Sequence, residues 1–101
     1  MVSESEIIAM GKGELSTPSA FKSLQAMINS GDVWQLDQSY HAIVMDLIGA
    51  GRNMLGKEHC FDRYGNFVPS RDYCLPGRKG SFKLVVDSFG EDYAKGLEED
   101  A

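Results

Sequence analysis

The sequence has few cysteines and no long apolar segment, and each shortage excludes a class of protein. Two cysteines among 101 residues are too few for the disulfide framework of a small secreted protein. No uninterrupted apolar run approaches the roughly 20 residues that a membrane-spanning helix needs. The chain begins Met1-Val-Ser-Glu-Ser-Glu, with acids where a signal peptide carries basic residues. We therefore expect a cytoplasmic protein with reduced thiols and no membrane partner.

What is present is the composition of one soluble globular domain. Apolar side chains make up 43% of the chain and charged ones 25%, which is typical of such a domain. A chain of this length buries about two thirds of the surface that it exposes when unfolded, so it can form one modest core. We expect a single domain over residues 1–101, with ends at 1–16 and 97–101 that are free to be flexible.

The formal charge of −5 is distributed unevenly along the chain. Six acidic and two basic residues give residues 1–50 a charge of −4, and residues 81–101 also carry −4. Six basic and three acidic residues give residues 51–80 a charge of +3. The sequence therefore predicts two acidic regions flanking a basic one, and regions of opposite sign attract different partners.

Capping residues and apolar spacing predict helices in the N-terminal half. Ser3 and Glu6 fit a capping box for a short first helix. Thr17 is a good cap for a helix over 18–29, because a proline follows it and apolar residues then recur on one face. Asp37 can cap another helix, which ends at the glycines of 49–51. Trp34 lies in the connector between these two helices, where its ring would close the end of the core.

The pattern after residue 51 is different. Aromatic and β-branched residues around a Tyr-Gly-Asn turn predict a β-hairpin across 58–68, and prolines make 69–80 a loop. From Ser81 onward an apolar stripe reaches Tyr93 with helical spacing, although 82–86 alone could be a strand, and the longer stripe favours one helix. The expected fold is α+β, with two to three amphipathic helices packed on a small antiparallel hairpin.

No catalytic or metal-binding signature is complete. The soft or imidazole ligands are His41, His59, Cys60 and Cys74, and their spacing matches no zinc motif. We expect no metal and no cofactor. A hydrolase or thiol enzyme using Cys60 or Cys74 with His59 is the catalytic alternative, but neither of the two histidines lies in a recognisable nucleophile motif. His41 is expected on the surface of its helix, where Asp37 at i−4 stabilises the helix locally. The sequence therefore predicts a protein that is not an enzyme.

The segment with the most chemical character is Pro76-Gly-Arg-Lys-Gly-Ser81. Glycines let the backbone approach an anion, the cations add charge, and a helix beginning at Ser81 would direct free amides toward the same place. The segment resembles the G-x-x-G loop of a KH domain, although a KH loop joins two helices and Pro76 disfavours one here. A tight turn before a helix is the simpler alternative. The candidate phosphate-binding residues are Arg71, Gly77, Arg78, Lys79 and Gly80.

Charge interleaved with aromatic rings around this segment is the composition of a surface that binds single-stranded nucleic acid. The opposing interpretation is that the arginines pair with acids on neighbouring helices, and the net charge favours it. The residues concerned are Arg52, Lys57, His59, Phe61, Arg63, Tyr64, Phe67, Arg71 and Tyr73.

The most specific stretch of the chain is Tyr64-Gly-Asn-Phe-Val-Pro-Ser-Arg71, which follows Asp62-Arg63. Other parts of residues 31–86 accompany it, among them Gly31-Asp-Val-Trp-Gln-Leu-Asp-Gln-Ser-Tyr40 and Met45-Asp-Leu-Ile-Gly-Ala-Gly51. Together they resemble a group of small proteins encoded by tailed bacteriophages and prophages. The resemblance transfers no activity. It implies a bacterial host cytoplasm during infection, and an accessory factor rather than a part of the virion.

The leading functional hypothesis is a non-catalytic phage accessory protein that binds a host protein or protein–nucleic-acid complex. One such role is the inhibition of a defence system such as CRISPR–Cas, because an acidic surface can occupy a basic nucleic-acid-binding cleft. A homodimer is also compatible with a domain of this size. The alternative is a nucleic-acid or nucleotide-phosphate binding module built on the loop at 77–81. The acidic face expected for the leading hypothesis consists of Asp87, Glu91, Asp92, Glu98 and Glu99.

Overall fold

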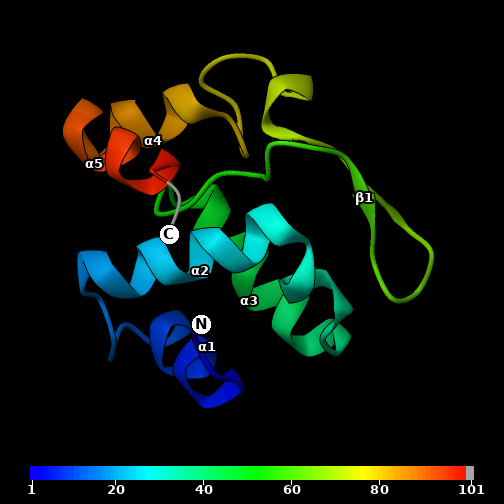
Figure 1. Cartoon of the computed structure of the whole chain (residues 1–101). Coiled ribbons are helices and arrows are strands. Elements are labelled where there is room, and N and C mark those ends of the chain that lie inside the picture. Colours follow the sequence, from blue (N-terminus) through cyan, green and yellow to red (C-terminus); the bar gives the residue numbers. More distant parts are fainter. Residues whose placement is uncertain (100–101) are drawn as a thin grey trace.

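The computed structural model describes residues 1–99, and these form five α-helices, two short 3₁₀-helices and one antiparallel hairpin. Helix α1 packs on α3, while α5 packs on both α2 and α4 (Figure 1). The hairpin projects from one side of the helices. The expected α+β class is confirmed, with more helices than the two or three predicted. The elements in chain order are α1 (Glu4–Gly11), α2 (Pro18–Ser30), η1 (Asp32–Gln35), α3 (Gln38–Gly49), β1 (Cys60–Phe61), β2 (Phe67–Val68), η2 (Arg71–Tyr73), α4 (Phe82–Phe89) and α5 (Glu91–Glu98).

The predicted helix starts are all present. Ser3 and Glu6 form the capping box of α1, with each side chain accepting a hydrogen bond from the other residue's backbone amide, at 3.2 and 2.9 Å. The side chains of Thr17, Asp37 and Ser81 each accept a hydrogen bond from an amide in the first turn of α2, α3 and α4. These caps satisfy amides that have no partner within the helix. Local signals therefore set where the helices begin.

The C-terminal stripe forms two helices, so the prediction of one helix was wrong, as was the strand alternative for 82–86. Gly90 separates α4 from α5 and has φ 96° and ψ 161°. Only glycine adopts this conformation readily, and it breaks the run of helical hydrogen bonds. Two residues of the predicted stripe still pack together across the break between the helices: the ring centroids of Phe89 and Tyr93 are 5.3 Å apart.

The hairpin lies within the predicted range of 58–68, but each strand is only two residues long. Its register pairs Cys60 with Val68 and Phe61 with Phe67. Successive residues of a strand point to opposite faces. The first pair is partly buried against the helices, whereas the second pair is exposed. One face of the hairpin therefore contributes to the core and the other presents two phenyl rings to solvent.

The core lies between the three N-terminal helices and the α4–α5 pair. Trp34 of η1 is 3% exposed and belongs to the core. A buried polar pair joins α2 to the segment after α3. The Asn53 side-chain amide donates to Gln25 Oε1 at 3.2 Å, and Gln25 also bonds the main chain of Met54. Burying these amides is tolerated because they bond each other and the backbone. The fully or nearly fully buried apolar residues include Ile7, Phe21, Leu24, Ile28, Val33, Val44, Ile48, Met54, Val85 and Ala94.

The chain ends contribute side chains to the core. Val2, Ile7 and Met10 of the expected flexible segment 1–16 are buried, and so is Leu97 in α5. The last part of the second segment expected to be flexible, residues 100–101, lies outside the described residues. Within residues 1–99, none of the helices combines the length and apolar character that crossing a bilayer would demand.

Candidate functional site

The glycine-rich loop proposed for phosphate is a closed turn. The Gly77 amide donates to Ser81 Oγ at 3.1 Å, and the amides of Arg78 and Ser81 donate to main-chain carbonyls of the same loop at 3.0 Å. Gly80 is buried, and a Cβ there would lie 2.7 Å from Leu55 Cδ1. The glycines and the serine therefore have structural reasons to be present, as expected for a turn before a helix. The cations Arg78 and Lys79 are exposed.

Arg71 points into the protein, away from the anion site predicted for it. Its side chain is 6% exposed, and its guanidinium donates to the Leu55 carbonyl at 2.9 Å, to Asn29 Oδ1 at 2.7 Å and to Glu98 Oε2 at 3.2 Å. It thus joins α2, α5 and the segment between α3 and the hairpin. The ion pair between Arg71 and Glu98 of α5 agrees with the interpretation, favoured by the net charge, that the arginines pair with acids on neighbouring helices.

The acidic face is exposed on α4 and α5, but basic side chains balance most of it. Ion pairs join Asp87 to Lys83 at 2.9 Å and Glu91 to Lys95 at 2.7 Å within the helices. A hydrogen bond from Lys95 lowers the pKa of Glu91. The remaining pairs are longer, from Glu98 to Arg71 at 3.2 Å and from Glu99 to Lys22 at 3.4 Å. Asp92 is exposed. Four of these five acids thus have a cation beside them, which weakens their field on a distant partner.

Neither thiol has the environment of a nucleophile. Cys60 and Cys74 are free and partly buried. Burial raises the pKa of both thiols, and the carboxylate of Asp62 raises that of Cys60 further. A reactive cysteine has the opposite shift. His59 uses Nδ1 to accept a hydrogen bond from the Ser70 amide at 3.3 Å, and within the described residues no three His, Cys, Asp or Glu side chains gather as a metal ion would require.

The exposed face of the hairpin carries an unusual concentration of rings, which we call the aromatic surface: His59, Phe61, Phe67 and Tyr73. Phe61, Phe67 and Tyr73 are 61%, 49% and 71% exposed. The rings of His59, Phe67 and Tyr73 contact one another and Phe61 contacts Phe67, with centroid separations between 5.2 and 6.1 Å. Sequence composition had drawn attention to these rings, but only the hairpin register and η2 bring them to one face.

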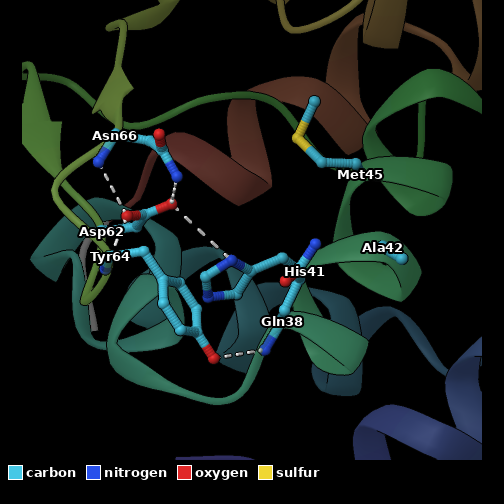
Figure 2. Close-up of a pocket in the computed structure, with 7 residues that line it drawn as sticks. All are labelled: Gln38, His41, Ala42, Met45, Asp62, Tyr64 and Asn66. Atoms are coloured by element: carbon cyan, nitrogen blue, oxygen red, sulfur yellow. Dashed lines mark hydrogen bonds and ion pairs between the residues drawn. The ribbon is translucent and has the colours of Figure 1, made fainter.

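A cleft separates the other side of the hairpin from α3, and Figure 2 shows the side chains that line it. Its volume is about 470 Å³. Inside, His41 Nδ1 lies 3.9 Å from Asp62 Oδ2, and the imidazole packs edge-on against Trp34 and Tyr64 at 5.5 and 6.0 Å. We call this hollow the hairpin cleft. It is lined by Gln38, His41, Ala42, Met45, Asp62, Tyr64 and Asn66.

His41 was predicted on the helix surface, and that was wrong, because its side chain is only 12% exposed. The hairpin folds over it, which local helix spacing cannot reveal. The expected partner Asp37 instead accepts hydrogen bonds from the amide and hydroxyl of Ser39, which lower its pKa. The Tyr64 hydroxyl donates to the same Asp37 at 3.4 Å and so attaches the hairpin tip to the start of α3.

Asp62 is held by its own turn. Its Oδ1 accepts the amides of Tyr64 and Asn66 at 2.8 and 2.9 Å, and its Oδ2 accepts the Asn66 side-chain amide at 3.2 Å. Desolvation raises the pKa of this carboxyl, but the hydrogen bonds from Asn66 and Tyr64, with His41 nearby, outweigh it and leave the pKa below its ordinary value. The carboxylate is therefore ionised at neutral pH. The Asp-x-Tyr-Gly-Asn pattern is the sequence signal that could have identified it.

A second hollow of about 260 Å³ adjoins the hairpin cleft. The two share His41, Met45 and Asp62, and the second also includes Phe67 of the aromatic surface. Its remaining lining is apolar: Trp34, Leu55, Val68 and Pro69. The hairpin therefore borders two candidate binding sites, the aromatic surface on its exposed face and the hairpin cleft between it and α3.

With this geometry established, comparison with known proteins gives no relative: no family model, no curated protein and no solved structure matches the chain.

Proposed function

We propose that this chain is a non-catalytic binding protein that attaches to a protein partner through the aromatic surface. The observation that carries the proposal is the exposure of Phe61, Phe67 and Tyr73 beside one another, although the core is complete without them. Contiguous exposed apolar area of this kind marks interaction sites. Aromatic side chains also supply much of the binding energy at protein interfaces.

The phage resemblance gives this proposal its setting. A phage accessory protein acts on components of the host cytoplasm, so the partner would be a host protein or a protein–nucleic-acid complex, such as a component of a CRISPR–Cas defence system. The charge of −5 favours a basic partner at long range. The absence of an activated thiol supports a role in binding rather than catalysis.

The alternative partner, a nucleic acid, has weaker support. Arg78 and Lys79 are exposed at the loop, but Arg71 is bonded inside the protein and the amides of Gly77 and Ser81 already have acceptors. A phosphate would have to displace these bonds or rely on two exposed cations alone.

The test is capture of a partner from a bacterial lysate by the tagged protein and by variants that replace exposed apolar side chains with serine. Phe61→Ser together with Phe67→Ser removes two rings whose side chains are exposed, so the fold should persist. Ile8→Ser is the control, because Ile8 is also an exposed apolar residue, at 37%, but lies on α1. We expect the double variant to lose at least tenfold in partner binding and the control to bind as the unchanged protein does.

Three results would refute the proposal. The first is capture that the double variant retains within about twofold. The second is binding of purified nucleic acid that the double variant loses, which would assign the site to nucleic acid. The third is a dimer in analytical ultracentrifugation that Phe61→Ser with Phe67→Ser converts to a monomer, which would assign the aromatic surface to a second copy of the chain.

A further inference from the structure

The hairpin cleft contains a partly buried carboxylate without a permanent counter-charge. The Asp62 side chain is only 9% exposed. Its hydrogen bonds come from amides, which are neutral. Of the described residues, His41 alone lies within ion-pair distance, and it is charged only when protonated. Arg63 is nearby in sequence, but it lies over the Tyr64 ring and its charge acts on Asp37. An ionised carboxylate in such surroundings is stabilised by a cation.

The unused bonding capacity of Asp62 is on Oδ2. Each carboxylate oxygen can accept two hydrogen bonds. Oδ1 has two, whereas Oδ2 has one at 3.2 Å and a contact with His41 Nδ1 that is too long, at 3.9 Å, to be a hydrogen bond. In Figure 2 Oδ2 lies between Asn66 and the imidazole, on the cleft side of the turn. A donor entering the cleft would therefore find a charged acceptor there.

The rest of the lining fits a long cationic side chain. Gln38 and Asn66 contribute polar amide side chains to the lining, and Met45 and Ala42 form an apolar side on α3. A volume of about 470 Å³ is ample for one side chain, since a cavity of about 150 Å³ holds a benzene molecule. Long basic side chains combine an apolar stem with a charged head, so the two kinds of lining match the two parts of such a side chain.

From these observations we infer that the hairpin cleft binds the guanidinium group of an arginine side chain presented by the protein partner. Asp62 Oδ2 accepts from the guanidinium, while Ala42 and Met45 contact its methylene stem. Arginine suits the cleft better than lysine, because a planar head with five donors can reach several acceptors at once. An anionic ligand such as a phosphate would be repelled by the same carboxylate. The inference deepens the proposed function, on which it rests, by naming a chemical feature of the partner.

His41 borders the carboxylate inside the cleft. Its imidazole is surrounded by Asp62 and Tyr64 from the hairpin and by Trp34 from η1. The Nε2 atom of His41 is buried without a hydrogen-bond partner among the described residues.

The test needs no knowledge of the partner. N-acetyl-L-arginine amide is titrated into the ¹⁵N-labelled protein, with the N-acetyl amides of citrulline and lysine as controls, since citrulline has the same shape as arginine without its charge. We expect saturable shifts in the amide signals of Ala42, Asp62 and Asn66 with arginine, and binding at least tenfold weaker with citrulline. Equal binding of citrulline or of lysine would overturn the assignment to a guanidinium. So would the absence of shifts at the highest concentration at which the arginine derivative stays dissolved.

Variants locate the binding. Asp62→Asn should weaken arginine binding at least tenfold, but it also alters the hairpin turn. Ala42→Trp therefore provides a second test, because Ala42 is exposed on α3 and a bulky ring there fills the cleft without disturbing the turn. Ala50→Trp is its control, at an exposed position of another hollow. Retained binding in Ala42→Trp would refute the location.

A failure of arginine binding overturns this inference alone, because capture of the partner is tested separately by Phe61→Ser with Phe67→Ser.

Discussion

Replacing Arg71 by alanine is expected to destabilise the protein severely, because the side chain is 6% exposed and holds three parts of the fold together. Two of its hydrogen bonds, to the Leu55 carbonyl and to Asn29 Oδ1, are short, at 2.9 and 2.7 Å. Hydrogen bonds from a charged donor contribute about 1.5–3 kcal/mol each. The bond to Glu98 adds less, because that carboxylate is 44% exposed and solvent screens it.

Together these bonds and the lost packing of the stem predict a decrease in the free energy of unfolding of about 3–5 kcal/mol for Arg71→Ala. Arg71→Lys keeps the charge but not the planar head, so it should lose about 2 kcal/mol. Urea unfolding, followed by circular dichroism and by the fluorescence of the single tryptophan, Trp34, measures both. Arg78→Ala is the control, because Arg78 is exposed and should change stability by less than about 0.5 kcal/mol. A loss below about 1 kcal/mol for Arg71→Ala would refute the structural role and return Arg71 to the candidate anion ligands.

Two further predictions concern a tight glycine and the thiols. Gly80→Ala should destabilise the protein more than Gly65→Ala. Both glycines have positive φ, 94° and 83°, but only at Gly80 would a Cβ meet the Leu55 side chain. Equal decreases in the free energy of unfolding, measured in urea, would contradict this packing. Since burial raises the pKa of Cys60 and Cys74, the thiolate fraction at about pH 8 is lower in the folded protein than in the unfolded one. Both thiols should therefore react more slowly with iodoacetamide in buffer than in urea, and equal rates in a peptide-mapping time course would show that burial does not protect them.

The candidate site was only partly accessible from the sequence. The aromatic residues were identified by composition, because they are close together in the chain. The pairing of His41 with Asp62 was missed, since the two are on different elements and nothing in local spacing indicates that the hairpin covers α3. Arg71 was grouped with the loop cations by proximity in sequence, whereas its side chain turns to α2 and α5.

The sequence by itself determined where the helices begin and where the hairpin turns, because caps, glycines and turn residues act through neighbours a few positions away. It also determined the α+β class, which follows from apolar periodicity. Only the tertiary structure decided which charges are paired, which rings stay exposed and that Asp62 lies partly buried beside a histidine. Those properties depend on contacts between residues far apart in the chain, such as the packing of the hairpin on α3. The function proposed here depends on those contacts.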